Sequence, residues 1–92
     1  MMVKMSTRGL YSKLLDLRES KNLAQFYWST IHKTIGLVET LSADTVCIRQ
    51  IDSLGEDDGF ITIPTGHITH VIESSKEILQ IKHFLIQKSL SF

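Results

Sequence analysis

The chain has 92 residues, and its ten Lys and Arg side chains are balanced by ten Asp and Glu, so its formal net charge at pH 7 is zero. This length predicts a single domain spanning residues 1–92, because a second independent core needs more residues. The zero charge argues against a dedicated nucleic-acid binder, which usually carries a clear basic excess. The single cysteine, Cys47, excludes an intramolecular disulfide and favours a reducing compartment. No apolar run approaches the length of a membrane span, so we expect a cytoplasmic protein without a membrane partner.

An N-terminal helix is predicted over about residues 6–21. Leu10, Leu14 and Leu17 recur at the spacing of one helical face. The run Ser20-Lys21-Asn22 then ends the periodic pattern with residues suited to a turn.

Short strands separated by polar turns are predicted over about residues 22–73. In the first strand, the alternation of side chains puts Phe26 and Trp28 on one face and Tyr27 on the other. His32-Lys33 is expected to be a tight connection to the second strand. Gly36 lies inside that strand, where a glycine often marks a bend or a close approach of another backbone.

The later strands are expected to flank an acidic loop. Pro64 is expected to interrupt the fourth strand, because proline has no backbone N–H. The loop itself carries Glu56, Asp57 and Asp58, whereas most of the basic residues precede it. Such a separation of charge can orient subunits, although two solvated surfaces would look the same in sequence. The five strands are expected at residues 23–31, 34–41, 45–52, 60–63 and 68–73.

A C-terminal helix is predicted over about residues 75–88. Ser74 and Glu77 have the spacing of a capping box. Beyond the main apolar face of this helix, Phe84 and Ile86 leave apolar surface that needs a second packing partner. This partner is expected to be either a second subunit, which would make Phe84 and Ile86 oligomer contacts, or the N-terminal helix.

A helix followed by five short, strongly bent antiparallel strands resembles the Sm-like fold, the small β-barrel family that includes Hfq. The resemblance covers about residues 6–73, with the barrel at about 22–73, and it is strongest to short uncharacterised bacterial proteins of this pattern. Residues 51–55 (IDSLG) stand where the family's first motif carries an acidic and a polar RNA-contacting residue. Residues 65–68 (TGHI) stand where its second motif links the fourth and fifth strands. No Asn follows Asp52, and no basic residue precedes His67 in the second motif.

The resemblance implies a set of RNA or ligand contacts on two loops, namely Asp52, Ser53, Thr65, Gly66 and His67. His67 and His70 have H-x-x-H spacing, but on a strand such residues point to opposite faces, so no metal site is expected. The sequence contains no G-x-S-x-G elbow and no glycine-rich phosphate loop. We therefore expect no catalytic residue, no cofactor and no enzyme activity.

Two functions remain open. The first is an interaction module that forms a homo-oligomer, either a dimer or a ring, and binds a protein partner. The second is an Sm-like RNA-binding ring acting in post-transcriptional regulation, for which the net charge gives no support. In the Sm-like family, the fourth strand of one subunit pairs with the fifth strand of the next, and a ring built in this way and a dimer that uses the C-terminal helix both remain open.

Overall fold

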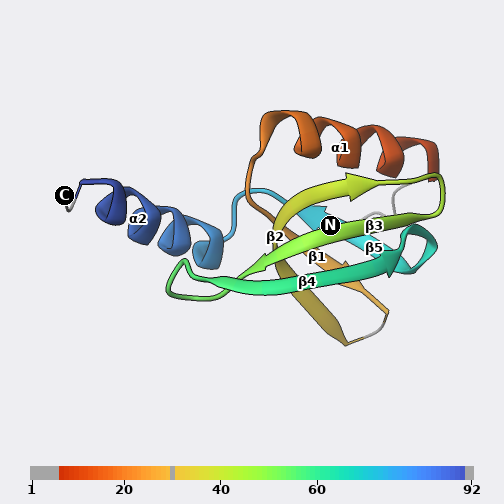
Figure 1. The fold of residues 1–92 in the computed structure, drawn as a ribbon. Helices are drawn as coiled ribbons and strands as arrows, with labels where there is room; N and C mark the ends of the chain where they lie inside the picture. The colour runs from red at the N-terminus through yellow and green to blue at the C-terminus, as the bar shows by residue number, and fades with distance from the viewer. Residues whose placement is uncertain (1–6, 30, 91–92) are drawn as a thin grey trace.

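The computed structural model describes residues 7–29 and 31–90 (Figure 1). All strand pairs are antiparallel and form one sheet in the order β4-β3-β2-β1-β5. The chain is therefore mainly β with a helix on either side, as the sequence predicts. The elements in chain order are α1 (Thr7–Ser20), β1 (Ala24–Trp28), β2 (His32–Leu41), β3 (Thr45–Ile51), β4 (Asp57–Pro64), the 3-10 helix η1 (Thr65–His67), β5 (Ile68–Ile72) and α2 (Lys76–Leu90).

The larger core lies between α1 and one face of the sheet. Helix α1 covers the sheet (Figure 1), and its predicted apolar face of Leu10, Leu14 and Leu17 is almost completely buried. Burial of each such side chain contributes about 1.5–3 kcal/mol to stability. The strand residues of this core are Ala24, Phe26, Val38, Val46, Ile48, Ile63 and Ile68.

A smaller core lies on the other face, where α2 begins. Ile78 and Ile81 are buried there together with Leu23, and half-buried Ile35 and Leu37 pack against them from β2. Because β2 alternates its side chains, it contributes to both cores. The rest of α2 projects away from the sheet toward the C-terminus (Figure 1).

Gly36 confirms the predicted close approach of two backbones. A Cβ at this position would overlap the carbonyl oxygen of Arg49 and would lie 2.8 Å from Cγ2 of Ile48. Gly36 pairs with Gln50 across the β2–β3 ladder, so the missing side chain leaves room for β3.

The predicted connection at His32-Lys33 is wrong, because β2 begins at His32. His32 pairs with Trp28, and the two rings stack with centroids 4.4 Å apart. The Trp28 indole N–H also donates to Oγ1 of Thr34 at 3.0 Å. These contacts extend the hairpin, and the turn begins at Ser29, whose φ is 55°.

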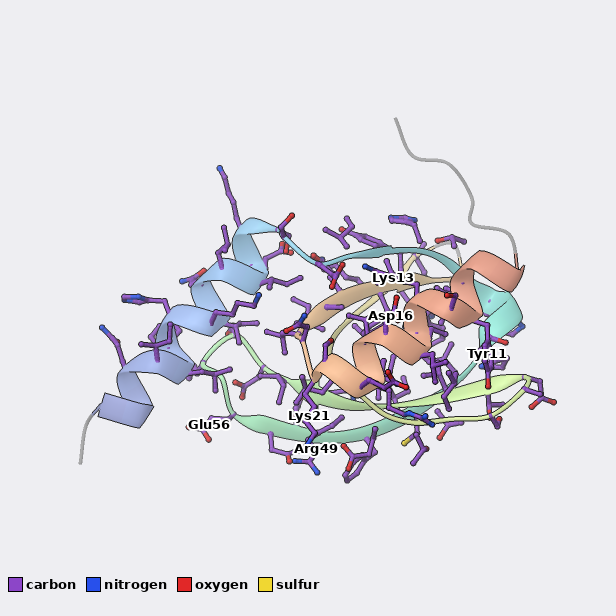
Figure 2. All side chains as sticks on the ribbon, turned by 90° about the horizontal axis from the view of Figure 1, so that it is seen from above. Tyr11, Lys13, Asp16, Lys21, Arg49 and Glu56 are labelled. Carbon is purple, nitrogen blue, oxygen red and sulfur yellow. The ribbon has the colours of Figure 1, made fainter. Side chains whose placement is uncertain are left out.

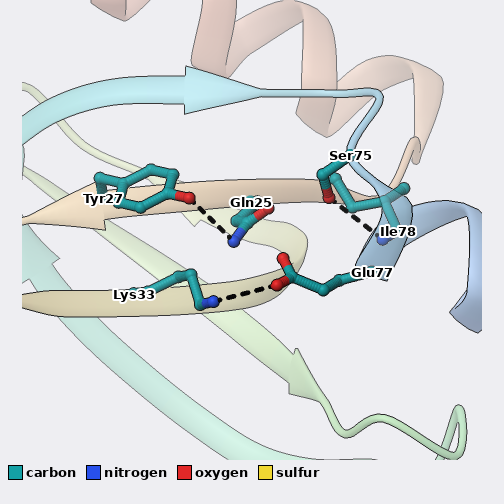
Figure 3. A network of polar contacts seen from close by, with 6 residues as sticks. All are labelled: Gln25, Tyr27, Lys33, Ser75, Glu77 and Ile78. Atoms are coloured by element: carbon teal, nitrogen blue, oxygen red, sulfur yellow. Dashed lines mark hydrogen bonds and ion pairs between the residues drawn. The ribbon is translucent and has the colours of Figure 1, made fainter.

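The predicted capping box of α2 is also wrong, because the helix starts one residue later than that motif requires. The Ile78 N–H donates to Oγ of Ser75 at 3.2 Å (Figure 3), so Ser75 caps the helix in place of Ser74. The Glu77 carboxylate instead accepts a hydrogen bond from Nζ of Lys33 at 3.2 Å (Figure 3). This ion pair joins the start of α2 to β2.

Candidate functional site

The residues predicted to contact RNA or a ligand fall into two groups at opposite ends of the β3–β4 hairpin. Asp52 and Ser53 follow β3, whereas Thr65, Gly66 and His67 form η1 after β4. The eight residues of β4 separate the groups by roughly 25 Å, at about 3.3 Å per residue. Within one chain the structure therefore does not bring the two groups together.

The Asp52 carboxylate is occupied by its own loop. Its Oδ1 accepts hydrogen bonds from the backbone N–H groups of Leu54 and Glu56, both at 2.9 Å. The loop is closed further by a bond from the Asp52 N–H to the Glu56 carbonyl at 2.9 Å. Asp52 thus fixes the shape of the hairpin tip.

The second group surrounds the joint between β4 and β5. Thr65 is buried, whereas Gly66 and His67 are exposed. The His67 carbonyl accepts a bond from the Ser29 N–H at 2.9 Å, which links η1 to the β1–β2 turn. In the described part of the chain, no group of three or more His, Cys, Asp or Glu side chains is placed to hold a metal ion.

The two residues predicted as oligomer contacts differ in exposure. Ile86 is 59% exposed on the projecting part of α2. Phe84 is half-buried, and a Cβ at Gly55 would lie 3.7 Å from its Cβ, which places the hairpin tip beside this turn of the helix. Ile86 therefore remains open to a partner, whereas Phe84 packs partly within the chain.

The free edge of β4 presents backbone groups for pairing with another strand. The Thr65 N–H donates to the Asp44 carbonyl at 2.9 Å, and Pro64 pairs with Thr45. This pattern makes Pro64 and Thr45 a pair without mutual hydrogen bonds, so the nitrogen of Pro64 points to the free edge. The prediction that Pro64 interrupts the strand is therefore wrong, because β4 includes this residue without losing a ladder bond.

The alternation of hydrogen-bonded and non-hydrogen-bonded pairs also shows which other backbone groups of β4 point to the free edge. The register between β3 and β4 is regular from Phe60 to Pro64, so the backbone groups of Phe60 and Thr62 also point outward. Phe60 is 58% exposed, and Thr62 is exposed as well. Like β4, β5 is bonded to only one strand among the described residues. The sheet thus has two edges available for pairing.

A polar pocket lies beside the β1–β2 turn. It has a volume of about 310 Å³. Tyr27 of β1 and His70 of β5 line it, and their rings stack at a centroid distance of 4.1 Å and an angle of 17°. The other lining residues are Ser29, Ile31, His32, Lys33 and Thr69.

Hydrogen bonds fix the two stacked rings. Gln25 is fully buried, and its Nε2 donates to the Tyr27 hydroxyl at 3.2 Å (Figure 3). The Thr69 hydroxyl lies within hydrogen-bond distance of both the Tyr27 carbonyl, at 3.2 Å, and Nδ1 of His70, at 3.1 Å. The other ring nitrogen of His70, Nε2, is buried with no partner among the described residues.

Sequence reasoning missed this pocket because the strand register creates it. Tyr27 pairs with His70 across β1 and β5, 43 positions apart in the numbering. The only sequence signal is the alternation of residues 26–28, which puts Tyr27 on the face away from the main core. Nothing in the sequence assigns His70 to the same place.

Comparisons with known proteins leave the family open. Neither a family model nor a curated protein matches this chain. None of the helices in residues 7–29 and 31–90 is long and apolar enough to span a membrane.

Proposed function

We propose that this chain is a small cytoplasmic interaction module that self-associates through the edges of its sheet and binds a protein partner. The observation that carries the proposal is the free edge of β4. The backbone groups of Phe60 and Thr62 point out from this edge, and the side chains of both residues are exposed. An exposed edge strand readily pairs with a strand of another chain. The function is one of binding, with no catalytic step.

The resemblance to Sm-like proteins suggests how the copies pair. In that family the fourth strand of one subunit joins the fifth strand of the next. Here β4 and β5 are the two outer strands of the sheet, which is the arrangement that such a contact requires. Pro64 removes one donor at the end of the edge and leaves the groups at Phe60 and Thr62 available.

Replacement of Thr62 by proline tests the edge contact. The Thr62 N–H points away from β3, so Thr62→Pro removes a donor from the free edge and leaves the β3–β4 ladder intact. We expect a lower solution mass by light scattering than for the unchanged chain. The matched control is Thr62→Ala, which keeps the N–H and should keep the mass. An unchanged mass in Thr62→Pro, or a monomeric unchanged chain, would contradict the edge contact.

We propose RNA binding as a second candidate function, favoured by the pocket around Tyr27 and His70. Aromatic side chains provide stacking surfaces for single-stranded bases. The Lys33 side chain, which is 44% exposed and ion-paired with Glu77, lines the same pocket. This site uses none of the five residues assigned from the resemblance.

Fluorescence anisotropy with a labelled single-stranded RNA oligonucleotide tests this candidate. Tyr27→Ala should weaken binding by about 5- to 150-fold, the effect of losing one stacked base. Tyr11→Ala, at an exposed tyrosine of α1, is the control and should bind normally. His67→Ala separates the pocket from the contacts that the resemblance implies. Absence of binding at low salt, or equal losses in the Tyr27 and Tyr11 variants, would exclude the pocket as an RNA site.

A further inference from the structure

A cationic groove lies between the end of α1 and the middle of β2 and β3. Its volume is about 370 Å³. Arg18 lies in the last turn of α1, Lys21 directly follows the helix, and Arg49 comes from β3 (Lys21 and Arg49 are labelled in Figure 2). Lys21 is held in place by a bond from its N–H to the Leu17 carbonyl at 2.9 Å. The remaining lining residues are Leu37, Val38 and Glu39.

The groove has an excess of positive charge. Arg49 is paired with Glu39 at 3.1 Å and lies 4.0 Å from Asp57, so its charge is balanced. Arg18 and Lys21 are exposed and form no ion pair with any described residue.

The tip of the β3–β4 hairpin has the complementary character. Leu54 is 58% exposed at this tip, and the acidic residues Glu56, Asp57 and Asp58 follow it. Because Asp57 already lies 4.0 Å from Arg49 of its own chain, exposed Asp58 is the acid that carries the complementary charge. The tip is rigid, because the carboxylate of Asp52 holds two of its backbone N–H groups and the carboxylate of Asp57 accepts from the Gly59 N–H at 2.9 Å. It is therefore a preformed apolar knob with acidic flanks.

We propose that the groove receives the hairpin tip of a second copy of this chain. A partner for these surfaces must offer an acidic apolar knob and a cationic groove, and the chain itself offers both. The large exposure of Leu54 excludes that the tip fills the groove of its own chain.

The two surfaces adjoin, since Arg49 of the groove lies next to Asp57 of the tip. When two complementary surfaces lie side by side on each chain, a two-fold axis places each tip in the groove of the other chain at the same time. The result is a closed dimer. This contact is separate from the proposed pairing of sheet edges.

Charge reversal in the Thr62→Pro background tests the contact, because this background removes edge pairing. We expect this background to sediment as a dimer. Asp58→Arg and Arg18→Glu should each weaken the dimer at least tenfold, and their combination should restore it. The control Asp16→Arg makes the same change of net charge at an exposed position of α1 and should leave the dimer intact.

Two results would overturn the inference. One is a Thr62→Pro background that stays monomeric at all protein concentrations. The other is an Asp58→Arg variant whose dissociation constant equals that of the Asp16→Arg control. Arg18→Glu places an acid in the last turn of α1, so circular dichroism checks its helix content, and Asp58→Arg in the loop decides the outcome independently. The difference in mass between the Thr62→Ala and Thr62→Pro variants reports on the edge contact, whereas the monomer–dimer equilibrium of the Thr62→Pro variant reports on the groove contact, so the two proposals fail separately.

Discussion

Gly36 shows how a single missing side chain lets two strands approach. Its backbone faces the carbonyl of Arg49 so closely that a methyl group cannot fit. The neighbour is backbone and cannot rotate away, so Gly36→Ala should force β2 and β3 apart. We expect a loss of about 1–3 kcal/mol in the free energy of unfolding, measured by denaturant titration.

Gly66 provides the matched control for this measurement. No atom lies within 4 Å of a Cβ placed there, and its φ is outside the left-handed region. Gly66→Ala should change the free energy of unfolding by less than about 0.5 kcal/mol. If the two variants proved equally stable, the close approach at Gly36 would carry no energetic weight.

At the scale of elements, α2 is attached to the sheet by very few side chains. Ile78 and Ile81 are its buried anchors, and the ion pair between Lys33 and Glu77 is exposed. Exposed ion pairs contribute little, typically below about 1 kcal/mol. The attachment of α2 therefore depends mainly on the two isoleucines, with Phe84 and Leu85 adding a contact beside Gly55 of the hairpin tip.

Ile81→Ala should weaken the attachment of α2 to the sheet more than any substitution on the exposed face of this helix. Removal of a buried isoleucine side chain costs about 2–5 kcal/mol. Leu79→Ala, at a side chain that is 59% exposed, should cost less than about 0.5 kcal/mol. Amide hydrogen exchange of the α2 residues measures the difference, and equal exchange in both variants would show that other contacts hold the helix.

At the scale of the whole molecule, the net charge is zero although the chain carries a positive surface and a negative surface. The free cations Arg18 and Lys21 end α1, and the acids lie at the hairpin tip (Glu56 in Figure 2). Sheet edges that pair head to tail extend an assembly, whereas a two-fold contact closes it. A chain with both kinds of contact can form assemblies larger than a dimer without any further surface.

The sequence by itself determined the order of elements and the buried face of α1. Leu10, Leu14 and Leu17 repeat at helical spacing, and residues 26–28 alternate at strand spacing, so local periodicity was sufficient for both. These features depend on neighbours within a few positions, which is the range that a sequence pattern records.

Only the tertiary structure decided which backbone groups of β4 face the free edge and which residues form the pocket around Tyr27. The direction of the Pro64 nitrogen depends on its register with Thr45, and the stack of Tyr27 on His70 depends on the pairing of β1 with β5. The N-cap of α2 is Ser75 and not the predicted Ser74, because the helix starts where Ile78 is buried in the small core. In each case the deciding contact joins residues far apart in the chain or depends on packing, and local periodicity carries no record of it.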